Sequence, residues 1–378
     1  MTIAIDPVEL AKALIACPSV TPARGAVFDI LANALQIAGF QVDRFVSEDA
    51  AGDRIENLFA SRGSGAPRFA FAGHLDVVPG GPDWSGDPFA PEVRGGLLYG
   101  RGAVDMKGAV AAFVAATALV EHGGTLSLIV TGDEEGAATH GTRALIDWME
   151  ARAIVPDAIL VGEPTCEARL GDTIKIGRRG SVNMWIDVPG TEGHVAYPHL
   201  VDNPLRKLGP LLDALHALPL DEGNEWFEPS NLEVTDIAVG NSACNVIPSQ
   251  ARLRLNIRFN NIQQGSPLIE RVRDVVDGLV PGATLKAAVA GEAFLSPPST
   301  LVRALEQSIL AETNCVALSS TSGGTSDARF LSKLCPVAEF GLVNATMHKR
   351  DEAVAVEDLQ ALARIYAAVI ARMLPLSG

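Results

Sequence analysis

Short apolar runs alternate with longer helical patterns in the first part of the chain, and this alternation restricts the fold more than any other sequence feature. The apolar runs predict buried strands, and the spacing of apolar residues between them predicts helices. In chain order, the predicted elements are a strand at Arg68–Gly73, a helix at Asp105–Glu121, a strand at Thr125–Thr131, a helix at Thr139–Arg152 and a strand at Ala158–Val161. This order is typical of a sheet layered between helices, so we expect an α/β fold.

After Gly180 the pattern changes. Apolar and polar residues alternate in Val182–Val188 and again in Leu253–Phe259, which indicates strands that bury only one face. Helical patterns accompany these strands at Pro204–Leu218 and Pro267–Leu279. The pattern therefore predicts a small α+β domain in this segment.

The chain has 378 residues, more than one hydrophobic core usually supports, so two domains are expected. Helix–strand alternation resumes near Ser299 and continues to Leu374. We therefore predict a discontinuous main domain formed by residues 1–179 and 294–378, with a second domain inserted at residues 180–293.

Acidic residues outnumber basic ones, 45 to 30, and the formal net charge is −15. A chain without surplus Lys and Arg is not expected to bind nucleic acid or a membrane surface. Met1–Leu14 lacks a signal-peptide pattern, and the apolar stretch Gly108–Val120 is too short to span a bilayer. Five scattered cysteines without CxxC spacing argue against a disulfide framework or a thiolate zinc site. We expect a cytoplasmic protein.

Histidine and acidic residues follow the predicted strands, where open α/β sheets place their sites. His74 could bind a metal while Asp76 accepts the other ring N–H, or His74 could be structural or merely exposed. Asp105 opens an Ala-rich helix, where it is either a helix cap or a carboxylate that bridges two metal ions. The glycines around Asp105 would let the backbone approach closely.

More candidate ligands follow later strands. Glu134 and Glu135 belong to a run of three acids after Thr131, which is either a solvated turn or a place where one carboxylate binds metal and its neighbour acts as a base. Glu163 and His348 each follow a further apolar run. Together these residues suit a pair of zinc ions with nitrogen and oxygen ligands. The sequence has no GxSxG elbow, P-loop or HExxH motif.

Longer motifs are spread over essentially the whole chain. They are HLDVVP (His74–Pro79), DMKG (Asp105–Gly108), GDEEG (Gly132–Gly136), GRRGS (Gly177–Ser181), GHVAYPH (Gly193–His199) and SGGTSD (Ser322–Asp327). By these motifs the chain resembles the M20 family of di-zinc metallohydrolases, which includes aminoacylases and carboxypeptidases. The resemblance implies a zinc-exopeptidase-like α/β main domain with an inserted α+β dimerisation domain.

The resemblance also implies a site for two zinc ions per subunit, with Co²⁺ able to substitute at one of them. Asp105 would bridge the ions. The implied ligands are His74, Asp105 and Glu163 for one site, and Asp105, Glu135 and His348 for the other. Asp76 would orient His74, and Glu134 would be the general base that takes a proton from the attacking water.

His194 lies in the inserted domain. By resemblance it would reach the active site of the partner subunit in a homodimer and hydrogen-bond the oxyanion, although a loop His without catalytic duty is the alternative. The implied substrate is a small anionic molecule, held by Arg178 and by Arg258, which could instead simply face solvent. The other implied substrate contacts are Ser181, Tyr197, Asn245, Gly324, Thr325 and Asn344.

Within the family, the GRRGS and SGGTSD motifs resemble those of members that remove a succinyl group from a diamino acid in the diaminopimelate and lysine pathway, so the resemblance implies this reaction. Three alternatives stay open: an acetylornithine deacetylase, a peptidase of the same fold, and a metal-binding protein without catalysis. Glu134 argues against the last, because a non-catalytic relative would be expected to lack the base.

Overall fold

The computed structural model describes residues 5–48, 52, 54–136, 138, 140–296 and 298–376. Contacts between residues divide the chain into two compact units. The larger unit comprises Met1–Ile176, Ser296–Ser320 and Ser326–Gly378, and the smaller unit comprises Gly177–Leu295 and Thr321–Thr325. No helix in the part of the chain that the structure describes is long and apolar enough to cross a membrane.

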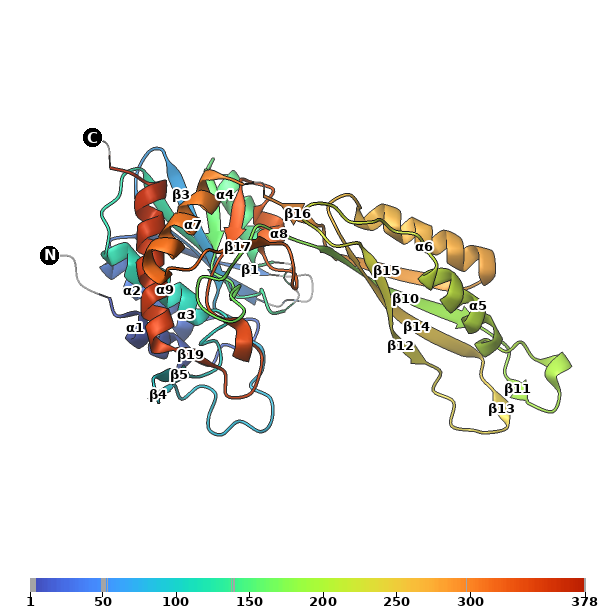
Figure 1. Cartoon of the computed structure of the whole chain (residues 1–378). Helices are drawn as coiled ribbons and strands as arrows, with labels where there is room; N and C mark the ends of the chain where they lie inside the picture. Colours follow the sequence, from blue (N-terminus) through green and yellow to red (C-terminus); the bar gives the residue numbers. More distant parts are fainter. Residues whose placement is uncertain are drawn as a thin grey trace. The chain divides into compact units, whose positions relative to one another are not determined.

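A mixed sheet forms the centre of the larger unit (Figure 1). Within the described residues it has eight strands, in the order β1 (Gln41–Glu48), β2 (Arg54–Gly63), β6 (Thr125–Thr131), β3 (Arg68–His74), β7 (Ala158–Val161), β18 (Val337–Glu339), β8 (Thr173–Lys175) and β17 (Leu318–Ser320). The four neighbours β6, β3, β7 and β18 run parallel. Their carboxyl ends therefore lie at one edge of the sheet.

Helices pack on this sheet. They are α1 (Pro7–Ile15), α2 (Ala26–Ile37), α3 (Lys107–Ala118), α4 (Thr142–Glu150), α7 (Thr300–Thr313), α8 (Ala328–Leu331) and α9 (Val356–Met373). A small sheet of β4 (Glu92–Arg94), β5 (Leu97–Tyr99) and β19 (Ala353–Ala355) joins the start of α9 to the segment before α3.

Aromatic side chains show that helices cover both faces of the large sheet. Phe71 of β3 stacks on Phe113 of α3, with ring centroids 4.2 Å apart. The strand register from β3 through β6 to β2 turns Phe59 to the opposite face. There Phe59 contacts Trp148 of α4, with ring centroids 5.3 Å apart. The predicted sheet layered between helices is confirmed.

The elements predicted for the first part of the chain occur with small differences at their ends. The strands β6 and β7 have the predicted bounds, and β3 includes one more residue, His74. Helix α3 begins at Lys107 instead of Asp105. Helix α4 begins at Thr142, and Thr139, the predicted first residue of that helix, lies outside the described residues.

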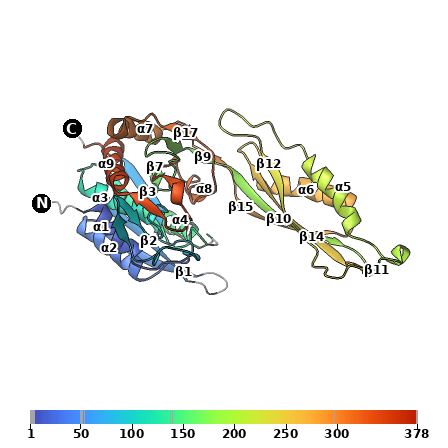
Figure 2. The ribbon, with the colours of Figure 1, turned by 60° about the horizontal axis from the view of Figure 1, so that its bottom comes forward.

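The smaller unit has an antiparallel sheet with helices on one face (Figure 2). The strand order is β12 (Asn231–Ala238), β14 (Gln250–Phe259), β10 (Gly180–Pro189) and β15 (Thr284–Gly291), and the helices are α5 (Leu205–His216) and α6 (Gly265–Leu279). Alternate residues of β10 and β14, such as Met184 and Leu255, are fully buried in one core with both helices. This arrangement confirms the expected one-sided α+β fold.

Short strand pairs complete the smaller unit. One pair is β11 (Gly193–His194) with β13 (Val246–Ile247), and the other is β9 (Gly177–Arg178) with β16 (Phe294–Leu295). Single-turn 3-10 helices occur at Pro198–Leu200 in this unit and at Asn344–Thr346 in the larger unit.

Candidate metal centre

The candidate ligands come from the shared edge of the four parallel strands. His74 is the last residue of β3, and Glu134 and Glu163 follow β6 and β7 within a few residues. His348 follows β18 after a loop that includes a 3-10 turn. Because parallel strands end at the same edge, the topology brings these side chains together.

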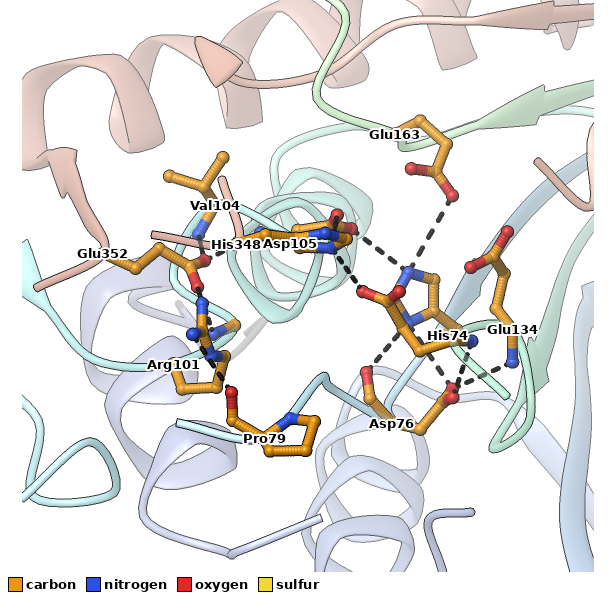
Figure 3. A network of polar contacts seen from close by, with 12 residues as sticks. His74, Asp76, Pro79, Arg101, Val104, Asp105, Glu134, Glu163, His348 and Glu352 are labelled. Carbon is orange, nitrogen blue, oxygen red and sulfur yellow. Dashed lines mark hydrogen bonds and ion pairs between the residues drawn. The ribbon is translucent and has the colours of Figure 1, made fainter. Parts of the chain in front are cut away.

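Asp105 stands at the centre of the group (Figure 3). Its Oδ1 lies 3.2 Å from Nε2 of His74, and its Oδ2 lies 3.1 Å from Nε2 of His348. Glu163 Oε1 is 3.8 Å from the same His74 nitrogen, and Glu135 Oε1 is 2.8 Å from the His348 nitrogen. The two carboxylate oxygens of Asp105 thus face two separate pairs of potential ligands.

These spacings fit divalent metal ions. Zinc bonds to nitrogen and oxygen are about 2.0–2.2 Å long, so ligand atoms around one tetrahedral ion lie about 3.3 Å apart. His74, Asp105 and Glu135 offer ligand atoms within 4.8 Å of one another, and so do His74, Glu134 and Glu163. The donor set of imidazoles and carboxylates is the one that zinc and similar metals bind.

His74 is held in one orientation. Its Nδ1 donates to the main-chain carbonyl of Asp76 over 2.9 Å, and the Asp76 carboxylate is 3.5 Å from the same nitrogen. A proton on Nδ1 leaves the lone pair on Nε2, which points toward Asp105. Such an outer hydrogen bond fixes the tautomer that a metal ligand needs.

The buried Asp76 carboxylate also anchors the acidic loop after β6. Its oxygens accept the main-chain N–H groups of Glu134 and Glu135, over 3.2 and 2.9 Å. Asp76 therefore ties the loop that carries two acidic candidates to the strand end that carries His74.

The carboxylates and histidines strongly perturb one another. Burial, Glu163 and Asp327 raise the pKa of Glu134 well above its ordinary value. Hydrogen bonds to Asp105 and Glu135 raise the pKa of His348 to about 10. The excess of carboxylates thus favours positive charge at the centre. Because ligand histidines must be neutral, metal binding would release these protons.

Two alternatives that the sequence left open are excluded by the geometry. Asp105 is no helix cap, because Met106 precedes α3 and no side-chain hydrogen bond caps it. The run of acids is no solvated turn, since Asp133 is 4 % exposed and Glu135 contacts His348. His348 also has a φ of 59°, a left-handed conformation that non-glycine residues adopt at a cost and that clusters at functional sites.

Lys107 and Gly108 of the DMKG motif make close contacts at the start of α3. A Cβ on Gly108 would lie 2.2 Å from the carbonyl oxygen of Ala103, so a side chain there is excluded. The buried ammonium of Lys107 donates to the carbonyls of Leu14 and Cys17 at the end of α1, over 2.9 and 3.1 Å. These contacts hold the loop that precedes the helix.

Several residues around the centre were missed by the sequence analysis. Arg101 and Glu352 form a buried ion pair of 2.7 Å beside the Asp105 loop. The buried Asp327 carboxylate accepts a hydrogen bond from the Thr142 hydroxyl, over 2.6 Å, and burial raises the pKa of Asp327 to about 6. Asp327 belongs to the SGGTSD motif and Arg101 lies four positions before the DMKG motif, whereas Glu352 carries no local signal.

The other predicted site residues lie mostly in the smaller unit. His194 is exposed in β11, where it pairs with Val246, and its ring centroid is 5.7 Å from that of the exposed Tyr197. The neighbouring Asn245 accepts the main-chain N–H of Val195 over 3.1 Å.

The other predicted residues of the smaller unit lie on or beside β9, β10 and β14. Arg178 is on β9. Its Nη1 donates to the carbonyl of Gly324, next to Thr325, over 3.0 Å. Ser181 is aligned with the half-buried Arg258 in the β10–β14 register. Asn344 is the exception, because it lies in the larger unit, where its N–H donates to the carbonyl of Cys166 over 2.8 Å.

The sequence matches a known family. The sequence pattern of peptidase family M20/M25/M40 matches residues 70–372, and the chain belongs to this family. The resemblance that the motifs indicated is thereby confirmed.

Curated relatives are similar over nearly their whole length. A protein from Rhizorhabdus wittichii and one from Sphingopyxis alaskensis, both named succinyl-diaminopimelate desuccinylase, are each 60% identical to this chain. In both cases the match covers 99% of this chain and 100% of the relative.

Solved structures with low sequence identity share the fold. An M20 family metallo-carboxypeptidase from Sulfolobus solfataricus superimposes with a TM-score of 0.77 at 16% identity, and the match covers 98% of each chain. A dinuclear metal-binding peptidase of the M20 family from Bacillus subtilis gives a TM-score of 0.72 at 16% identity over 97% of each chain.

Proposed function

We propose that the chain hydrolyses N-succinyl-LL-2,6-diaminopimelate to succinate and LL-2,6-diaminopimelate, in the cytoplasmic biosynthesis of diaminopimelate and lysine. The observation that carries the chemistry is the convergence of His74 and His348 on the two oxygens of Asp105. The choice of substrate is supported by the names of relatives that are 60% identical over the whole chain.

The metal ions are proposed to be zinc, two per chain, with Co²⁺ able to replace one of them. The first ion would be held by His74, Asp105 and Glu163. The second would be held by Asp105, Glu135 and His348, so that Asp105 belongs to both ligand sets. Bound zinc would lower the pKa of a water molecule and polarise the amide carbonyl.

Glu134 is the proposed general base. Its main chain is fixed by Asp76, and its side chain belongs to the group of His74 and Glu163. In this position the carboxylate could first take a proton from the attacking water and then return it to the leaving amine. Glu134 would thus perform both proton transfers of amide hydrolysis.

Arginines are proposed to bind the carboxylates of the substrate. Arg178 is 8 % exposed beside Gly324, and Arg258 is half-buried on β14. A planar guanidinium matches a carboxylate through two parallel hydrogen bonds, which an acidic protein needs to hold an anionic substrate. Polar contacts would come in addition from Ser181, Tyr197, Asn245, Gly324, Thr325 and Asn344.

We propose further that the chain acts as a homodimer through the smaller unit, with His194 donating a hydrogen bond to the oxyanion in the partner's site. His194 is exposed, and this supports the proposal. The neighbouring Tyr197 is 56% exposed and Leu200 is 68% exposed. An exposed apolar surface of this kind suits an interface between copies.

Mixing two inactive variants tests the shared site. His194→Ala lacks the donor and Glu134→Gln lacks the base, so only a mixed dimer can combine both intact groups in one site. An equal mixture, unfolded and refolded together, is expected to recover roughly a quarter of the wild-type activity, because half of the dimers are mixed and each has one complete site. Recovery of no activity, although wild-type protein refolds fully, would contradict a His194 that acts across the interface.

A parallel hydrolysis assay tests the reaction and the substrate together. N-succinyl-LL-2,6-diaminopimelate and N-acetylornithine are offered to untreated protein, to chelated protein, and to chelated protein restored with zinc or with Co²⁺. We expect release of succinate that chelation abolishes and that either metal restores. The kcat/KM for N-acetylornithine should be at least about tenfold lower, because its acetyl group carries no carboxylate for an arginine to bind.

The other outcomes point to the alternatives. Preference for N-acetylornithine would keep the metal chemistry and assign an acetylornithine deacetylase. Hydrolysis of dipeptides alone would assign a peptidase of the same family. Zinc bound without activity on any of these compounds would leave a metal-binding protein.

A further inference from the structure

Glu352 is a fully buried carboxylate outside the proposed ligand set, immediately before β19. Its Oε1 accepts the main-chain N–H groups of Val104 and Asp105, over 2.7 and 3.1 Å. Its Oε2 accepts the N–H of Gly102 over 3.1 Å and a guanidinium N–H of Arg101 over 2.7 Å. Four donors from one loop thus converge on a single side chain (Figure 3).

Arg101 extends this network to a second loop. The side chain is 2% exposed, and its Nη2 donates to the carbonyls of Pro79 and Gly80 over 3.2 and 3.4 Å. Those two residues end the segment that begins with His74 and Asp76. The guanidinium also lies over the ring of Trp84, 5.2 Å from its centroid.

The ion pair therefore joins three loops, each of which carries or directly follows a proposed ligand. The first directly follows His74, the last residue of β3. The second carries Asp105, and the third carries both His348 and, four residues later, Glu352. Burying two charges is costly, and the cost is offset only when hydrogen bonds satisfy both groups in a defined geometry.

The Asp105 loop lies outside any helix or strand, so its main-chain N–H groups need other acceptors. Residues 101–106 are buried but lie in turns, and no side chain caps the following helix α3. Main-chain N–H groups in buried turns must find acceptors. Glu352 supplies the acceptor for three of them, including the N–H of Asp105 itself.

We propose that Glu352, held by Arg101, is a positioning residue for the metal centre. It fixes the main chain of Asp105 so that the two carboxylate oxygens face His74 and His348 at the same time. The inference rests on the proposed function, because it concerns the residue that would bridge the two ions.

The test is the metal affinity of Glu352→Gln, measured by competition with a chromogenic chelator on folded protein. The amide keeps the size of the side chain, but it replaces one acceptor oxygen with an NH₂ group. That NH₂ group would face either the N–H groups of Val104 and Asp105 or those of Gly102 and Arg101. We expect zinc to bind about 10–100-fold more weakly, the usual effect of losing an outer hydrogen bond at a metal site. We also expect an altered visible absorption spectrum of the Co²⁺-loaded variant, and recovery of kcat at saturating zinc with KM unchanged.

Conservative and matched variants separate positioning from general stability. Glu352→Asp keeps the charge and is expected to recover part of the affinity. Asp221→Asn is the matched control, because Asp221 also accepts main-chain N–H groups, those of Gly223 and Ser230, but belongs to the smaller unit, which contains none of the proposed metal ligands. Its zinc affinity should equal that of the wild type.

A lowered thermal stability of Glu352→Gln with wild-type zinc affinity and an unchanged Co²⁺ spectrum would overturn the inference and leave Glu352 a structural anchor. If Glu352→Gln does not fold, Arg101→Lys provides the same readouts, because a lysine cannot reach both Glu352 and the two carbonyls. Wild-type protein that binds no metal would instead refute the proposed function, so the two failures are distinguishable.

Discussion

Glu134→Gln is expected to lower kcat by about 10²–10⁴-fold, the usual contribution of a general base, while the metal content stays near that of the wild type. The amide cannot accept a proton at neutral pH. The substitution keeps the main-chain hydrogen bond to Asp76, which uses only the backbone of Glu134. Turnover is measured with N-succinyl-LL-2,6-diaminopimelate, and metal by elemental analysis of the same preparation.

The neighbouring residue supplies the control. Glu135→Gln makes the same chemical change one position later, but the Glu135 carboxylate lies 2.8 Å from the His348 ring and is a proposed ligand. That variant is expected to lose metal as well as activity. Because Glu134 also lies within ligand distance of His74 and Glu163, loss of metal from Glu134→Gln would show that it is a ligand and not the base.

Asp105→Ala is expected to remove the metal centre altogether. Both oxygens of this carboxylate face a histidine, so one substitution takes a ligand from both ions. Metal-ion catalysis supplies several kcal/mol of transition-state stabilisation, so kcat/KM should fall by about 10³-fold or more and excess zinc should not restore it. Metal stoichiometry is measured together with kcat/KM over a range of zinc concentrations.

Asp43→Ala is the control for Asp105→Ala, because Asp43 is an exposed carboxylate on β1 of the same unit. Its metal content and activity should match the wild type. Asp105→Asn is expected to be intermediate in metal affinity, since an amide offers one oxygen. Two metal ions bound to Asp105→Ala with wild-type affinity would refute the bridging role.

Much of the fold could be predicted because its elements are encoded locally. The strands β6 and β7 follow from continuous apolar runs, and the one-sided sheet of the smaller unit follows from strict alternation in β10 and β14. Helix ends were predicted less well. Helix α3 begins two residues after Asp105, because the loop before it is bound by Glu352 and not by a helix cap.

The candidate site was predictable only in part. His74, Glu134 and Glu163 follow strands whose parallel order already suggests a common edge. The sequence could not distinguish a metal-bridging Asp105 from a helix cap. The role of Asp105 depends on His74 and His348, which come from distant segments and both face its carboxylate. The contact between His348 and Glu135 likewise joins residues 213 positions apart.

The sequence by itself determined which segments form strands and helices, and which polar residues follow the strands, because local hydrophobic periodicity dictates both. It also determined the family, through motifs along the whole chain. Only the tertiary structure decided how the two oxygens of Asp105 are shared, and that Arg101 meets Glu352, 251 positions away. The physical reason is that a buried charge is tolerated only with its partner, and no local pattern specifies a partner that the chain supplies only after folding.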